Sequence, residues 1–116
     1  MIGKSVRAGI KAMGLKLFPE GVPTDTVTVI HKPNNVDIGT IIRMMREKYH
    51  IIVSGAPPSP RLQGRIFRIG HMGLQATPNN VISTLSALEM TLRSSGFELE
   101  LGAGVEAARR ILEKAF

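Results

Sequence analysis

Arg68 is the residue whose type and position best fit a ligand-binding role in this sequence. It lies in the run 65–69 (Arg-Ile-Phe-Arg-Ile), whose composition predicts a β-strand. Period-two geometry places Arg68 on one face with Ile66 and Gly70, and Phe67 on the opposite face. A guanidinium fixed at the end of a strand could hold both oxygens of a ligand carboxylate, because its planar fork matches that group.

A plainer interpretation of Arg68 stays open. An arginine on an edge strand can pack its aliphatic stem and extend its charged head into water, and spacing alone favours this interpretation. The neighbouring Gly64 and Gly70 have two readings as well. They could be turn residues with positive φ, or they could let a ligand or another segment approach the backbone closely.

The other titratable residues do not form a recognisable site. The histidines His31, His50 and His71 are far apart, with no carboxylate pair at ligand spacing, so no metal site is expected. No glycine-rich nucleotide-binding motif follows a predicted strand. The remaining acidic candidates are interpreted as solvated charges: Glu89, Glu98 and Glu100.

Length and composition exclude several classes of protein. The 116 residues fit one domain, 1–116, and the 43% hydrophobic content allows a packed core. The net charge of +6 comes from scattered lysines and arginines, and aromatic residues make up only 4%, so nucleic-acid binding is not expected. Cysteine is absent, apolar runs are too short to span a membrane, and no signal peptide is apparent, so a cytoplasmic protein is expected.

Hydrophobic periodicity and turn residues predict four helices and three strands. Asp37 and Thr77 are the expected N-caps of the second and third helices, and Pro78 fits the first helical position. The predicted ranges are helix 2–14, strand 26–30, helix 37–48, buried strand 51–53, loop 54–60, strand 65–69, helix 77–96 and helix 105–114. This order predicts an α+β fold, a two-layer sandwich with a small, three-stranded, mostly antiparallel sheet covered by helices.

One string within this pattern resembles a known family. Gly64-Arg-Ile-Phe-Arg-Ile-Gly-His-Met-Gly73 is similar to the phrase G-x-x-F-R-I-G-H-M-G near the end of class V aminotransferases, in the alanine–glyoxylate and serine–pyruvate branch. Segments 14–19, 26–30, 45–55 and 81–92 resemble the surrounding parts of the same domain. The resemblance extends from about residue 3 to residue 110.

The resemblance implies a fold and a role for two residues. The fold would be the small C-terminal domain of fold-type I pyridoxal-phosphate (PLP) enzymes. The arginine of the F-R-I-G phrase binds the substrate α-carboxylate in such enzymes, and that position is Arg68 here. Gly55 would lie at the mouth of the active site. This sequence departs from the family at Ala56, where a second glycine often follows, and in the rigid run Pro57-Pro58-Ser59-Pro60.

The resemblance also implies what must come from elsewhere. The large domain of such enzymes precedes the small one and holds the Schiff-base lysine, the aspartate on the pyridine nitrogen and the phosphate cup. PLP is therefore implied only for an assembled enzyme, and no residue of this chain is assigned to catalysis or to cofactor binding. The chain alone is expected to be inactive.

Two functions follow as hypotheses. The first is the substrate-carboxylate-recognising domain of an aminotransferase that moves an amino group between alanine or serine and glyoxylate or pyruvate. Its expected partners are a PLP-binding large domain, separately encoded or lost, and the small amino or keto acid; the assembled enzyme is expected to be a homodimer. The alternative is a non-catalytic protein-interaction module derived from that domain. Neither nucleic acid nor a membrane is an expected partner.

Overall fold

The computed structural model describes residues 2–17, 27–55, 64–70 and 77–115. It confirms the predicted order of elements and the α+β class, with boundaries that differ by a few residues. The elements are α1 (Ile2–Ala12), β1 (Val27–His31), α2 (Ile38–Tyr49), β2 (Ser54–Gly55), β3 (Ile66–Gly70), α3 (Pro78–Ser94) and α4 (Ala103–Ala115). Asp37 and Thr77 cap α2 and α3 as predicted, each accepting a hydrogen bond from the backbone three residues later.

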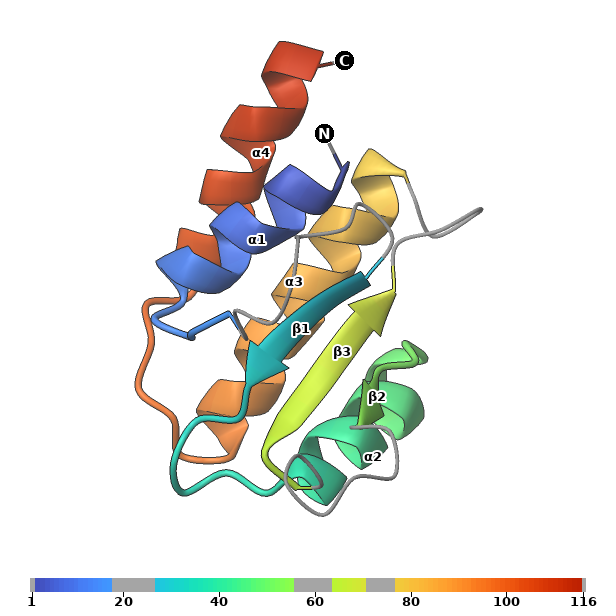
Figure 1. Cartoon of the computed structure of the whole chain (residues 1–116), viewed down its shortest axis with the longest axis vertical. Helices are drawn as coiled ribbons and strands as arrows, with labels where there is room; N and C mark the ends of the chain where they lie inside the picture. Colours follow the sequence, from blue (N-terminus) through green and yellow to red (C-terminus); the bar gives the residue numbers. More distant parts are fainter. Residues whose placement is uncertain (1, 18–26, 56–63, 71–76, 116) are drawn as a thin grey trace.

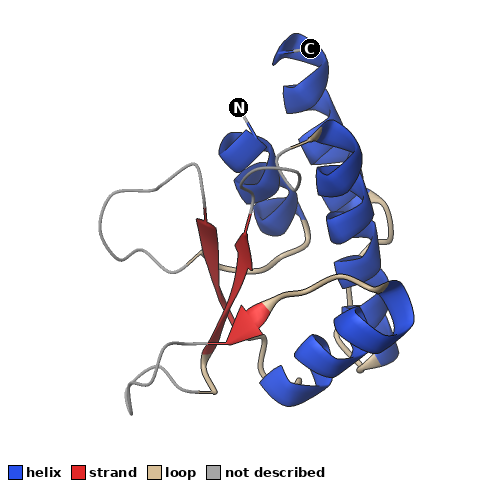
Figure 2. Ribbon diagram, turned by 90° about the vertical axis from the view of Figure 1, so that its right-hand side faces the viewer, coloured by secondary structure: helices blue, strands red, loops and turns tan. Residues whose placement is uncertain are grey.

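The three strands form an antiparallel sheet in the order β1-β3-β2, so β3 is the central strand. Figure 1 shows β1 and β3 side by side, with the short β2 next to α2. The described helices all lie on one side of this sheet (Figure 2). The architecture is therefore the predicted two-layer sandwich, in which one face of the sheet is left without a described helix.

The alternation of side chains along β3 decides which residues enter the core. Phe67 and Ile69 are buried within the main hydrophobic cluster, together with Ile30 of β1. Ile66 is also buried, but it does not belong to that cluster. Phe67 and Ile69 therefore face the helices, and Ile66 and Arg68 face the other way, as period-two geometry predicts.

The predicted buried strand at 51–53 is wrong. The backbone N–H of Ile51 bonds to the carbonyl of Met45 and thereby closes α2, whose C-cap His50 is left-handed. Pairing with β3 begins only at Ser54, and Ile52 is 63% exposed. The helix end uses the amide that a longer strand would have needed.

The interpretation of Glu89 as a solvated charge is also wrong. Its side chain is only 2% exposed, and Oε2 accepts hydrogen bonds from the backbone N–H groups of Gly102, at 2.9 Å, and Gly104, at 3.2 Å. These two residues lie at the start of α4, where backbone N–H groups have no partner within the helix. Glu89 of α3 thus caps α4 from outside.

Two glycines allow α1 and α4 to cross closely. A Cβ atom added to Gly9 would lie 2.9 Å from the carbonyl oxygen of Gly104, and one added to Gly104 would lie 2.9 Å from that of Gly9. Any larger residue would push the two backbones apart. Gly9, which weakens the helix by propensity alone, is therefore required by packing.

Candidate functional site

Arg68 lies in the middle of the central strand, with Val29 of β1 opposite it on one side and Ser54 of β2 on the other. Its side chain is half-buried and extends from the face of the sheet that carries no described helix. We call this the helix-free face. By strand register its members are Val27, Val29, His31, Ser54, Ile66, Arg68 and Gly70.

The guanidinium of Arg68 is tethered to the neighbouring strand. Its Nε–H donates a hydrogen bond of 2.9 Å to the carbonyl oxygen of Gly55. No acidic side chain among the described residues forms an ion pair with Arg68. Among the described residues only Nε has a partner, and the two terminal Nη groups present paired N–H donors whose geometry matches the two oxygens of a carboxylate.

The structure brings together the two residues that the sequence singled out, and it defines what Gly55 contributes. An added Cβ at Gly55 would meet Ile42 Cδ1 at 3.6 Å and Ile38 Cγ2 at 3.9 Å, which are ordinary contacts with α2. The α-carbon of Gly55 therefore faces the helices, and only its carbonyl reaches Arg68. Ala56 and the run 57–60, where the sequence departs from the family, lie outside the described residues.

Ser54 is a polar neighbour of Arg68 that the sequence reasoning missed. The sequence predicts a loop at 54–60, and a predicted loop does not define which residue Ser54 would face. The pairing of Ser54 with Arg68 places an exposed hydroxyl on the same face of the sheet. The sequence carries no signal for this pairing, because the residue types Ile-Ile-Val-Ser-Gly from 51 to 55 do not alternate between apolar and polar.

A cofactor site does not fit the lysines of this chain. A Schiff-base lysine is normally kept in a desolvated pocket, where burial lowers its pKa. Five of the six lysines are exposed, and the half-buried Lys32 donates through Nζ to the carbonyl of Pro33. Within the described residues, no three His, Asp or Glu side chains lie close enough to hold a metal ion.

The strongest ionic cluster lies far from Arg68 in the chain, on the exposed surface of α4. Arg109 bonds both Glu106 and Glu113, and Arg110 also bonds Glu106. The hydrogen bond from Arg109 lowers the pKa of Glu106, and Glu106 raises the pKa of Arg109. This is a solvated network along about two turns of α4, in which both arginines are paired with glutamates. Among the described helices, none is both long enough and apolar enough to span a bilayer.

The chain is similar to parts of several known proteins, although no protein-family profile matches it. It is 38% identical to an uncharacterized aminotransferase of Methanocaldococcus jannaschii and 31% identical to the pyridoxamine–pyruvate transaminase of Mesorhizobium japonicum. Each match covers 97% of this chain but only 29% of the relative.

A comparison with a solved structure shows the same partial coverage at the level of the fold. The ureidoglycine–glyoxylate aminotransferase of Bacillus subtilis superposes with a TM-score of 0.90 at 32% identity, over 97% of this chain and 29% of that one. The sequence and the fold therefore agree on the same limited part of these enzymes. The chain matches the small C-terminal domain of class V aminotransferases of the serine/alanine–glyoxylate type, and it spans about 29% of the length of these relatives.

Proposed function

We propose that this chain is the part of a PLP-dependent aminotransferase that recognises the substrate carboxylate. The assembled enzyme would move an amino group between a small amino acid, alanine or serine, and a 2-oxo acid, glyoxylate or pyruvate. The names of the relatives from Mesorhizobium and Bacillus, which include pyruvate and glyoxylate, support this class of acceptor. The observation that carries the proposal is the tethered guanidinium of Arg68, which no described acid neutralises.

The geometry of Arg68 supports this role. The bond from Nε to the Gly55 carbonyl removes part of the rotational freedom of the side chain before any ligand binds. The Nη groups can then form two charge-assisted hydrogen bonds to the carboxylate, which fixes the orientation of the substrate. The hydroxyl of Ser54 is placed to add a further donor on the same face.

The ion pair between Arg68 and the substrate carboxylate would have to be shielded from water. An ion pair exposed to water is worth under about 1 kcal/mol, and the helix-free face gives Arg68 only partial burial. The larger part of the enzyme, which makes up the remainder of the relatives, would close over Arg68 and exclude water. It would also hold PLP, which supplies the electron sink for the transfer of the amino group. We propose that the assembled enzyme is a cytoplasmic homodimer.

The proposal is tested by Arg68→Lys in an assembled enzyme. Such an enzyme can be made by replacing the matched 29% of the Bacillus subtilis relative with this chain. Lysine keeps the charge but loses the planar fork, so KM for the 2-oxo acid should rise by about tenfold or more. Arg65→Lys is the matched control, because Arg65 is exposed and precedes β3. An unchanged KM in Arg68→Lys would refute the role.

A further inference from the structure

A cavity of about 180 Å³ opens into the hydrophobic core between the end of β3, the segment before β2, and helices α1 and α3. It lies on the helix side of the sheet, because Ile69, which lines it, faces the helices. Arg68 extends from the opposite face. The cavity and the helix-free face therefore lie on opposite sides of the sheet.

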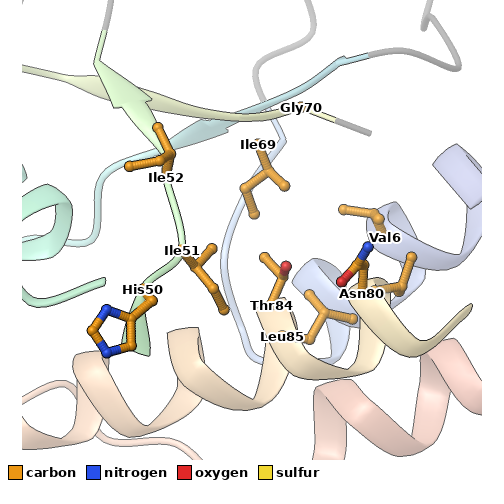
Figure 3. Close-up of a pocket in the computed structure, with 10 residues that line it drawn as sticks. Val6, His50, Ile51, Ile52, Ile69, Gly70, Asn80, Thr84 and Leu85 are labelled. Atoms are coloured by element: carbon orange, nitrogen blue, oxygen red, sulfur yellow. The ribbon is translucent and has the colours of Figure 1, made fainter. Parts of the chain in front are cut away.

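The floor of the cavity consists of apolar side chains that belong to the core. Four of them are at most 4% exposed: Val6, Ile69, Val81 and Leu85. Figure 3 shows Ile69 and Ile51 reaching into this space from the sheet side, and Leu85 and Val6 reaching it from the helices. Such a floor offers water no hydrogen-bond partners, and apolar cavities stay dry for this reason.

Polar groups lie on the α3 side of the opening. Asn80 and Thr84 are one turn apart on α3, and both line the cavity. Figure 3 shows the hydroxyl oxygen of Thr84 on the cavity side of the helix, with Asn80 beside it. Thr84 is half-buried and Asn80 is exposed, so these polar groups lie nearer to the solvent than the floor does. An apolar interior with a few polar groups on one side is the usual lining of a small-molecule site.

The charge of the lining restricts the class of ligand. Of the described residues that line the cavity, none is an Asp, Glu, Lys or Arg, and the one titratable residue, His50, is exposed. A charged ligand would therefore lose hydration in the cavity without gaining a counter-ion. The lining favours an uncharged molecule.

The volume restricts the size of the ligand. An apolar cavity of about 150 Å³ takes up one benzene molecule. A space of about 180 Å³ can therefore hold one six-membered ring with a short arm, and it is too small for two fused rings. A ring that fills the space would restore the dispersion contacts that the atoms around an empty cavity lack.

We propose that this cavity is a binding site for a small, uncharged molecule with one aromatic ring and one hydroxyl group. The ring packs against Val6, Ile69 and Leu85, and the hydroxyl at the opening donates a hydrogen bond to Oγ1 of Thr84. The occupant thereby links the sheet to α1 and α3, and it stabilises the folded chain by mass action. The proposal uses no contact with Arg68, so it does not rest on the proposed function.

The probe that tests the site is benzyl alcohol, added to the full chain with ¹³C-labelled Ile, Leu and Val methyl groups. The methyl resonances of Val6, Ile69 and Leu85 should shift and saturate with a Kd on the order of 1 mM, an affinity expected for a ligand of this size. Those of Ile42, which does not line the cavity, should stay in place. Benzoate has the same ring but carries a charge, and it should bind at these methyl groups about tenfold or more weakly.

Two variants of Thr84 separate the shape of the cavity from its hydrogen bond. Thr84→Phe fills the cavity from α3 and should abolish the shifts of the floor methyl groups. Thr84→Val keeps the shape and removes the hydroxyl. It should weaken benzyl alcohol about threefold or more and leave the affinity for toluene unchanged, because toluene has no group to donate. Circular dichroism checks the fold of both variants.

Each outcome bears on the proposal. It would be overturned by an absence of shifts at Val6, Ile69 and Leu85 in the parent chain, or by shifts that persist in a folded Thr84→Phe variant. An equal affinity for benzoate at these methyl groups would contradict the uncharged class. Equal losses for benzyl alcohol and toluene in Thr84→Val would contradict the hydrogen bond. If Thr84→Phe does not fold, the parent chain and Thr84→Val still decide the outcome.

Discussion

At the scale of single residues, the side chain of Arg68 is linked to the backbone of Gly55 by one hydrogen bond. The carbonyl of Gly55 accepts a hydrogen bond from Nε of Arg68, and under the proposed function the Nη groups would bind the ligand carboxylate. A glycine in this role needs no special conformation: Gly55 is not among the residues with positive φ, and space exists beside it for a methyl group. What the site requires at position 55 is the backbone of β2.

Gly55→Ala should therefore be tolerated. The new methyl group would contact Ile42 and Ile38 of α2, and the carbonyl bond to Arg68 would remain. We expect the free energy of unfolding to change by less than about 1 kcal/mol, and KM of the assembled enzyme to stay close to that of the parent. Denaturant unfolding and steady-state kinetics would measure both. A large rise in KM would mean that the α-carbon itself touches the substrate.

At the scale of elements, the crossing of α1 and α4 depends on two small residues. Gly9→Ala would place a methyl carbon 2.6 Å from Leu85 Cδ1 and 2.9 Å from the carbonyl of Gly104. Relieving this clash requires the backbones of α1 and α4 to move apart. We therefore expect the free energy of unfolding to fall by about 1–3 kcal/mol, although alanine has a better helix propensity than glycine. Urea unfolding measures this loss.

Gly104→Ala should behave in the same way, because its methyl carbon would meet Met13 and the carbonyl of Gly9. Ser86→Ala, on the exposed side of α3, is the control and should change stability by less than about 0.5 kcal/mol. If Gly9→Ala and Gly104→Ala were as stable as the parent, the close crossing would be contradicted.

The start of α4 depends on Glu89 of α3. Glu89→Ala leaves the N–H groups of Gly102 and Gly104 without their acceptor, which should cost about 1–3 kcal/mol. Glu89→Gln keeps one oxygen acceptor and should cost less. Thermal and denaturant unfolding would check the order, with the exposed Glu98→Ala as the control. Equal stability of Glu89→Ala and Glu98→Ala would contradict the cap.

These elements also show which features of the fold can be predicted from the sequence. Hydrophobic periodicity predicts each of the described helices, and the starts of α2 and α3 are predicted as well because Asp37, Thr77 and Pro78 act locally. The burial of Glu89 could not be predicted, since its partners lie 13 and 15 residues away in the chain. The predicted strand at 51–53 is wrong for a related reason. The backbone N–H of Ile51 bonds to Met45 at the end of α2, so pairing with β3 begins only at Ser54.

At the scale of the whole molecule, the helices stabilise one face of the sheet and leave Arg68 on the other (Figure 2). The position of Arg68 on one face of β3 was predicted from the alternation of residues 65–69. Its tether to Gly55 was not, because the sequence does not specify which carbonyl a long side chain will reach. The chain spans 29% of the length of its relatives, and under the proposed function a larger part of the enzyme would cover the helix-free face, where Arg68 is half-buried.

The most direct test determines whether Arg68 recognises the carboxylate of the substrate. In the assembled enzyme, kcat/KM is measured for pyruvate and for its neutral amide, pyruvamide, as amino acceptors. The preference for the acid should fall about tenfold or more in Arg68→Ala, because the charge-assisted bonds act only on the carboxylate. A preference that stays the same in Arg68→Ala and in the parent would contradict the central claim.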